Sequence, residues 1–141
     1  MYKKGINQYR QVGIKDQVAT ADPHKITQLL MQSALENLAI AKGCMTRKDL
    51  ANKAKPIAKA TAIITSLRNT LNYEAGGEIS ESLSDLYIFM LEKLSEASIT
   101  NNPQQIADVI EIMLPIKSAW DQIPESAKQE AYQQQRSVNA V

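Results

Sequence analysis

The chain has 141 residues, about the size of one ordinary domain and short for two. Lys and Arg number 16 against 15 Asp and Glu, and because both signs are scattered along the chain, a nucleic-acid-binding protein is a poor expectation. Five Gly, five Pro and an apolar fraction of 44% favour long helices over a turn-rich β-sandwich and argue against intrinsic disorder.

The first 22 residues carry scattered apolar side chains without a sustained period, so we expect a mobile arm over residues 1–22. A helix start follows, because Asp22 can cap the amino end and Pro23 suits the first helical position. The first helix is expected from about His24 to Lys42, with Gly43 ending it.

A second helix is predicted from a capping box formed by Thr46 and Asp49 and is expected to reach about Asn72. Pro56 lies inside this span, which predicts a kink or a restart of the helix near Lys55. The apolar stripe of this helix repeats in a heptad-like pattern and comprises Ile57, Ala60, Ile64, Leu67 and Leu71.

A third helix is expected after Gly76 and Gly77, since glycine takes the left-handed geometry that ends a helix at little cost. Its apolar residues have the most regular spacing in the chain, by threes and fours. They are Ile79, Leu83, Leu86, Tyr87, Met90, Leu94 and Ala97.

Asn102 and Pro103 repeat the cap-and-proline start and predict a fourth helix that reaches Trp120, with a bend at Pro115. After Pro124 the chain is polar, and we expect a marginal helix or a frayed tail there. The apolar residues of the fourth helix are Ile106, Val109, Ile110, Met113, Leu114 and Trp120. The predicted fold is therefore all-α: one domain over 1–141, with an arm (1–22), an antiparallel four-helix bundle (23–120) and a helix or tail (121–141).

The residues that carry chemistry are too few for an enzyme. His24 and Cys44 are the only His and Cys, and they lie on separate elements, so we expect no catalytic residue, no metal site and no cofactor. A phosphotransfer domain would place its His in the middle of a helix, whereas His24 lies in a first turn and is expected to face solvent. A lone Cys forms no intramolecular disulfide, and no cluster of His or Arg lies beside it in the sequence to lower its pKa. We therefore interpret Cys44 as incidental and expect the protein to lie in a reducing cytosol.

The third and fourth predicted helices contain more apolar residues than a four-helix bundle needs to form its core. Residues 86–91 are six consecutive apolar side chains, and residues 109–116 are nearly as apolar, although a bundle helix buries about three residues in seven. Two interpretations stay open: the arm and tail complete the core or a dimer interface, or the surplus forms a groove for a partner's amphipathic helix.

Several motifs in order resemble the flagellin export chaperones of the FliS family, from Tyr2 to Trp120. The longest is Glu-Ala-Gly-Gly-Glu-Ile at residues 74–79, which is followed at the family's spacing by Ser-Leu-Ser-Asp-Leu-Tyr at residues 82–87. Tyr9 with Val12, the helix start at residues 21–24 and the Ala-Trp pair at residues 119–120 are similar to further family elements.

The resemblance implies a cytosolic, non-enzymatic chaperone. Such a chaperone binds the disordered C-terminal segment of flagellin in apolar grooves, prevents premature polymerisation and delivers it to the cytoplasmic domain of the type III export gate. The family's early Ile and Tyr take part in docking at the gate, which implies Ile6 and Tyr9 here, with Val12 in the same arm. The alternative is a helical adaptor or dimerisation module that binds another amphipathic helix.

Eight apolar residues are the candidates for the flagellin groove: Met31, Leu35, Ile57, Ile64, Tyr87, Ile88, Phe89 and Leu91. Neither nucleic acid nor insertion into a membrane is expected. A co-chaperone or regulator and a homodimer remain open as partners, as do the preferred flagellin and an autoinhibitory role of the arm.

Overall fold

All regular elements are helices in the computed structural model, which describes residues 22–124, 126–131 and 133. The all-α fold class is therefore confirmed, whereas the predicted arm lies almost wholly outside the described residues. Residues 126–131 are also helical, as the prediction for the tail allowed. The named helices are α2 (Pro23–Thr46), α3 (Leu50–Asn69), α4 (Tyr73–Gly76), α5 (Glu78–Thr100) and α6 (Pro103–Asp121).

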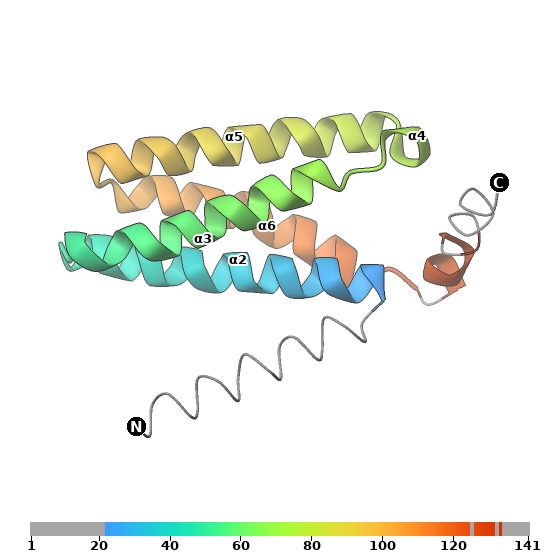
Figure 1. The fold of residues 1–141 in the computed structure, drawn as a ribbon, viewed down its shortest axis with the longest axis horizontal. Helices are drawn as coiled ribbons and strands as arrows, with labels where there is room; N and C mark the ends of the chain where they lie inside the picture. The colour runs from blue at the N-terminus through green and yellow to red at the C-terminus, as the bar shows by residue number, and fades with distance from the viewer. Residues whose placement is uncertain (1–21, 125, 132, 134–141) are drawn as a thin grey trace, which may run out of the picture.

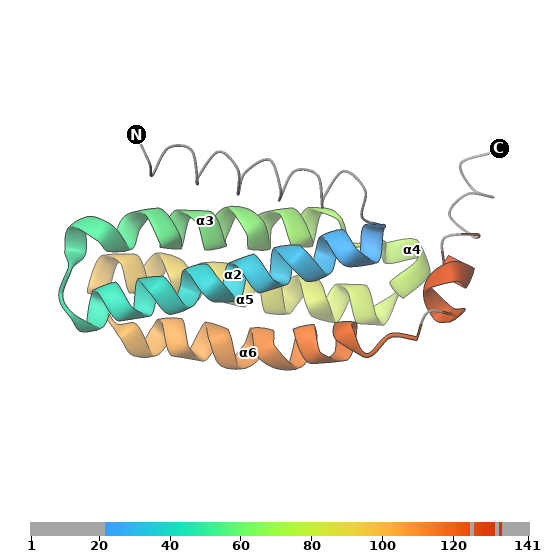
Figure 2. The same cartoon turned by 90° about the horizontal axis from the view of Figure 1, so that it is seen from below.

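The four long helices alternate in direction and lie side by side along one axis (Figures 1 and 2). Contacts join α2 to α3, α3 to α5, α5 to α6, and α6 back to α2, so the helices close a ring around a shared core. The start of α2 and the end of α6 thus meet at one end of the bundle, beside α4 and the start of α5. We call this the α4 end and the opposite one the far end.

The ends of α2 follow the expected capping at the start but not at the finish. Asp22 accepts a hydrogen bond of 2.8 Å from the Lys25 backbone N–H, and Pro23 occupies the first turn, as predicted. The helix continues through Gly43 to Thr46, so the predicted stop at Gly43 is wrong. Burial of Cys44 and Met45 offsets the cost of a glycine inside a helix, which is about 1 kcal/mol.

The predicted capping box between α2 and α3 is also wrong. The Thr46 hydroxyl donates to the Lys42 carbonyl inside α2, and Asp49 makes no side-chain cap on α3. The chain instead reverses direction at Lys48, whose φ of 58° is left-handed. In place of the predicted capping box, α2 is longer than expected and a tight turn connects it to α3.

Pro56 does not interrupt α3, so the predicted restart near Lys55 is wrong. A proline lacks the N–H that would bond the carbonyl four residues earlier, here that of Asn52. The Cys44 thiol fills this gap by donating to the Asn52 carbonyl at 3.6 Å. Cys44 is therefore a structural partner of a proline-containing helix rather than incidental. Helix α6 likewise runs unbroken through Pro115.

A one-turn helix, α4, connects α3 to α5 where the sequence predicted only a stop. Helix α3 ends at Asn69, three residues before the predicted end, and Asn72 caps α4 by accepting from the Ala75 backbone N–H at 3.0 Å. Gly77 then takes the predicted positive φ, 49°. A Cβ at Gly76 would lie only 2.0 Å from the Ser80 hydroxyl oxygen, so the close approach of α4 to α5 requires glycine there.

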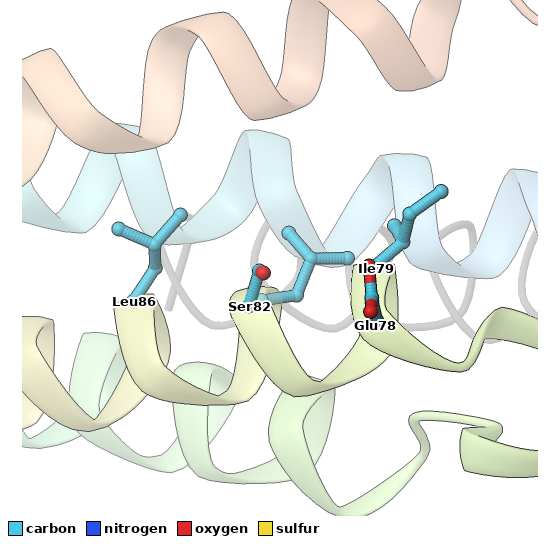
Figure 3. A pocket seen from close by; sticks show the side chains of 5 residues that line it. Glu78, Ile79, Ser82 and Leu86 are labelled. Atoms are coloured by element: carbon cyan, nitrogen blue, oxygen red, sulfur yellow. The ribbon is translucent and has the colours of Figure 1, made fainter.

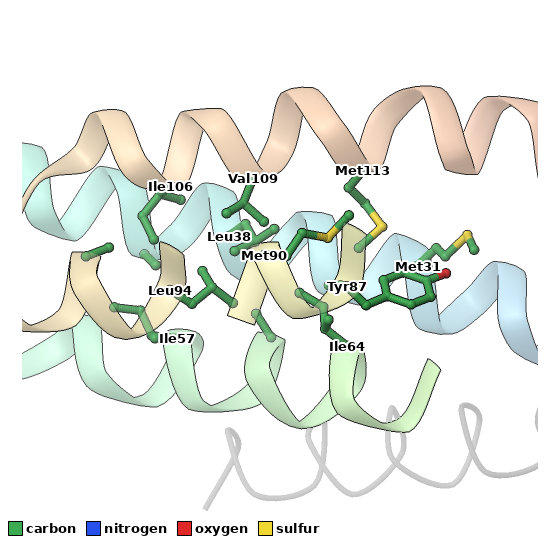
Figure 4. Close-up of a cluster of buried hydrophobic side chains, with 14 of the residues drawn as sticks. Met31, Leu38, Ile57, Ile64, Tyr87, Met90, Leu94, Ile106, Val109 and Met113 are labelled. Atoms are coloured by element: carbon green, nitrogen blue, oxygen red, sulfur yellow. The ribbon is translucent and has the colours of Figure 1, made fainter. Parts of the chain in front are cut away.

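The core joins buried residues of α2, α3, α5 and α6 (Figure 4). It includes most of the predicted stripe of α3, but Leu114 of the predicted α6 stripe is 51% exposed and lies outside it. Met90, Leu94 and Ala97 of α5 are fully buried, as are Ile106, Val109 and Met113 of α6. Fully buried Leu, Ile and Met side chains each contribute about 1.5–3 kcal/mol relative to exposure, which makes this cluster the main source of bundle stability.

Candidate partner-binding surface

The first half of α5 exposes part of its apolar stripe. Ile79 is 72% exposed and Leu86 is 38% exposed, while the neighbouring Ser80 and Ser84 are buried. Ile79 and Leu86 therefore lie outside the core although they belong to the regularly spaced apolar stripe of this helix, and Leu83 is only partly buried. An apolar stripe with regular helical spacing is left at the surface.

Two hydrogen bonds account for the buried serines. The Ser80 hydroxyl donates to the Asn72 carbonyl at 2.8 Å, and the Ser84 hydroxyl accepts from Arg68 Nε at 3.4 Å. Both partners lie at or just after the end of α3, so the serine side of α5 faces that helix. The apolar stripe lies about 100° around α5 from the serines and is turned away from them.

A hollow of about 320 Å³ lies over this stripe and is lined by Glu78, Ile79, Ser82, Leu83 and Leu86. Four of these side chains are labelled in Figure 3, and those of Ile79 and Leu86 project from the same side of α5. All five lining residues come from α5. We call this feature the α5 hollow.

Phe89 extends the apolar surface by one further turn. It is 42% exposed, and Lys93 Nζ lies 5.5 Å from the centre of its ring. Residues three or four apart share one side of a helix, so Phe89 continues from Leu86. We call Ile79, Leu83, Leu86 and Phe89 the α5 strip; it covers about 15 Å, at 1.5 Å per residue.

The eight candidate groove residues separate into three groups. Met31, Ile57, Ile64 and Tyr87 belong to the buried core, and burial raises the pKa of the Tyr87 phenol, which stays neutral. Leu35, Ile88 and Leu91 are partly buried, and Phe89 is exposed. A partner that binds the folded bundle can therefore contact Phe89 and the exposed edges of the three partly buried residues. It cannot contact the four residues of the buried core.

Sequence reasoning missed three members of the α5 strip, Ile79, Leu83 and Leu86, because their spacing matches a core stripe. The available signal was the parallel serine stripe at Ser80 and Ser84, which competes for the inward side. The two serines are buried because they bond to Asn72 and Arg68, which lie 8 and 16 residues away across the α3–α5 connection. Helical spacing within α5 does not reveal such bonds.

The α4 end is closed by a contact that the sequence did not suggest. His24 and Trp120 stack with ring centroids 4.8 Å apart and an interplanar angle of 7°. His24 Nε2 lies 2.8 Å from the Trp120 carbonyl, and Trp120 Nε1 donates to the His24 carbonyl at 3.0 Å. His24 is 5% exposed, so the expectation that it faces solvent is wrong.

Across the residues that the structure describes, no three His, Cys, Asp or Glu side chains are grouped to hold a metal ion. In the same part of the chain, no helix combines the length and apolar character needed to cross a membrane.

Comparison with known proteins identifies the family. The profile described as "Flagellar protein FliS" matches residues 5–127. The chain belongs to the FliS family. The predicted family resemblance is thus confirmed over most of the sequence, and with it the expectation of a non-enzymatic protein, because FliS proteins are chaperones.

The matches to three relatives in this family cover most of this chain and most of each relative. The flagellar secretion chaperone FliS of Vibrio cholerae is 45% identical over 116 residues, which are 82% of this chain and 85% of that protein. The flagellar secretion chaperone FliSB of Pseudomonas aeruginosa is 43% identical over 120 residues, 85% and 95% of the two chains. FliS of Salmonella typhimurium is 35% identical over 129 residues, 90% and 96% of the two chains.

Proposed function

We propose that this FliS-family protein is a cytosolic export chaperone that binds the disordered C-terminal segment of flagellin. Binding would cover the segment before export and so prevent premature polymerisation, and the loaded complex would then dock at the cytoplasmic domain of the type III export gate. Family membership supports a chaperone of flagellar secretion. The client and the gate are our inference.

The observation that carries the proposal is the α5 strip. Soluble proteins seldom leave a continuous apolar row at the surface unless it binds a partner. A row of about 15 Å fits nearly three turns of an amphipathic helix, which is the helix-in-groove mode of peptide recognition. The strip contributes Phe89 and Leu86. The partly buried Ile88 and Leu91 lie on other sides of α5, so the client would contact them, and Leu35 of α2, by wrapping around the bundle.

The proposal extends to residues that the structure does not describe. Ile6, Tyr9 and Val12 would take part in docking at the export gate, because the family's early Ile and Tyr do so. A homodimer and a co-chaperone or regulator remain further candidate partners.

Calorimetric titration with the C-terminal forty or so residues of flagellin from the same organism tests the proposal. We expect tight one-to-one binding with a large negative heat-capacity change, since a disordered client folds onto apolar surface. A scrambled segment of equal composition serves as the control. Equal heats for the two peptides would contradict the proposal and favour an adaptor for another amphipathic helix.

Two isoleucines of α5 provide a matched pair of variants. Ile79 is 72% exposed within the α5 strip, and Ile99 is 82% exposed near the other end of the same helix. Neither side chain belongs to the core, so both variants should fold. Ile79→Gln should weaken flagellin binding about tenfold, because one buried aliphatic side chain is worth roughly 1.5 kcal/mol or more. Ile99→Gln should leave the affinity within twofold.

A further inference from the structure

The bundle has an acidic side and a basic side. Helix α5 carries five acidic residues and one Lys, a net charge of −4, and α6 has a net charge of −2. Helix α3 carries three Lys and one Arg with no acidic residue, a net charge of +4, and α2 has a net charge of +1. The nearly neutral chain therefore folds so that α5 and α6 together bear −6.

Three acidic side chains lie on the exposed surface of the half of α5 that carries the hollow. Glu78 lines it, and Glu81 and Asp85 follow on the exposed side of α5. Among the described residues, none of these three carboxylates forms an ion pair, and the nearest basic group on their own helix, Lys93, lies over the Phe89 ring. On α6, Lys117 is bonded to Asp121 at 2.6 Å.

Stabilisation of the helix start explains only part of this arrangement. Glu78 and Glu81 lie in the first turn of α5, where negative charge is favourable. Asp85 lies seven residues beyond Glu78, outside the reach of that effect. Exposed carboxylates next to an apolar strip, with no ion pair to any residue that the structure describes, are instead complementary to a cationic partner.

We propose that the α5 hollow selects an amphipathic client segment whose apolar side chains are flanked by Lys or Arg. Ile79, Leu83 and Leu86 bind the apolar side of the segment, and Glu78 and Asp85 bind its cationic flank. The inference rests on the proposed chaperone function and adds a charge preference to it. Electrostatic contacts of this kind mainly set specificity and association rate, while apolar burial supplies most of the affinity.

Two synthetic 18-residue peptides test the charge preference with the full-length protein. Both carry Leu at positions i, i+3, i+4 and i+7, and their polar side is Lys in one peptide and Glu in the other. At 50 mM salt, the Lys peptide should bind about tenfold tighter than the Glu peptide, and the ratio should approach one at 500 mM salt, where exposed charges are screened within about 4–5 Å.

The double variant Glu78→Gln with Asp85→Asn should reduce this ratio at least threefold. Its matched control is Glu92→Gln with Glu96→Gln, which removes the same charge from the same helix. Glu92 lies about 10 Å beyond Asp85, at 1.5 Å per residue, so its charge acts on a peptide in the hollow from a greater distance than Glu78 and Asp85 do. The control should change the ratio less than twofold, and circular dichroism should show equal helix content for all proteins.

Failure of this inference is distinguishable from failure of the proposed function. If the flagellin segment binds but the Lys and Glu peptides bind equally, or both double variants act alike, the charge preference is wrong and the chaperone proposal stands. If the flagellin segment does not bind while the Lys peptide still binds preferentially at Glu78 and Asp85, the hollow serves another cationic partner. Affinity for the Lys peptide that rises with salt would mean that a basic segment of the chain itself occupies the hollow, which would overturn the proposal.

Discussion

The two halves of α5 have the same apolar spacing but opposite surroundings. In the second half, Met90, Leu94 and Ala97 are fully buried, whereas in the first half Ile79 and Leu86 are exposed and Ser80 and Ser84 are buried. The difference teaches that periodicity selects the apolar side of a helix but neighbouring helices decide which side is covered. At the α4 end, hydrogen bonds of Ser80 with Asn72 and of Ser84 with Arg68 hold the serine side of α5 inward, and the apolar side is exposed among the described residues.

Truncation of one leucine in each half of α5 should give the largest difference in the free energy of unfolding. Leu94 is fully buried and Leu86 is 38% exposed, so the same Leu→Ala change tests both environments in one helix. Leu94→Ala should lower the free energy of unfolding by about 3 kcal/mol, and Leu86→Ala by less than about 1 kcal/mol. Urea denaturation measures both, and equal losses would contradict the exposed position of Leu86.

The His24–Trp120 contact should hold the α4 end closed while the α5 strip remains exposed. Trp120→Phe keeps an aromatic ring but removes the Nε1 donor, which leaves the His24 carbonyl without that bond. We expect a loss of about 0.5–1.5 kcal/mol in the free energy of unfolding, the net contribution of one hydrogen bond, because the His24 carbonyl keeps its bond inside α2. Amide exchange should also accelerate in the first turns of α2. Unchanged stability would show that solvent replaces the indole bond at no cost.

Cys44 and Pro56 should be energetically coupled at the far end of the bundle. Cys44→Ala removes the donor to the Asn52 carbonyl, whereas Pro56→Ala supplies a backbone N–H to the same carbonyl. The cost of Cys44→Ala should therefore fall by roughly 0.5 kcal/mol in the Pro56→Ala background. A double-mutant cycle measures this coupling, and additive effects would exclude the shared carbonyl as the link.

The smallest expected effect concerns Asp121 at the end of α6. Hydrogen bonds from Lys117 and Gln28 hold the pKa of its carboxyl below the ordinary value. A lowered folded-state pKa stabilises the protein above the unfolded pKa of about 3.9, and this stabilisation is lost as pH falls through the folded-state value. Asp121→Asn should thus lower Tm slightly at pH 7 and not at pH 2. An equal decrease at both pH values would point to lost packing rather than charge.

Local signals predicted most of the fold. Asp22 with Pro23 and Asn102 with Pro103 determine the two helix starts through capping that depends on adjacent residues alone. The end of α2 and the continuity of α3 were not predictable in this way. They depend on burial of Met45 and on the Cys44 thiol, which reaches a carbonyl on the next helix.

The candidate surface was only partly predictable for the same reason. The apolar run at residues 86–91 correctly indicated surplus apolar character, and Phe89 is exposed within it. The run could not show that Tyr87 is core while Ile79, two turns earlier, is surface. That assignment depends on bonds of Ser80 and Ser84 to Asn72 and Arg68 across the α3–α5 connection.

Hydrogen exchange with mass spectrometry, with and without the C-terminal segment of flagellin, tests the central claim most directly. If the α5 strip is the client surface, amides in residues 78–90 should become protected on binding, while residues 95–100 at the far end of the same helix should change little. Protection confined to the far end, or none anywhere on α5 despite saturating flagellin, would contradict the account.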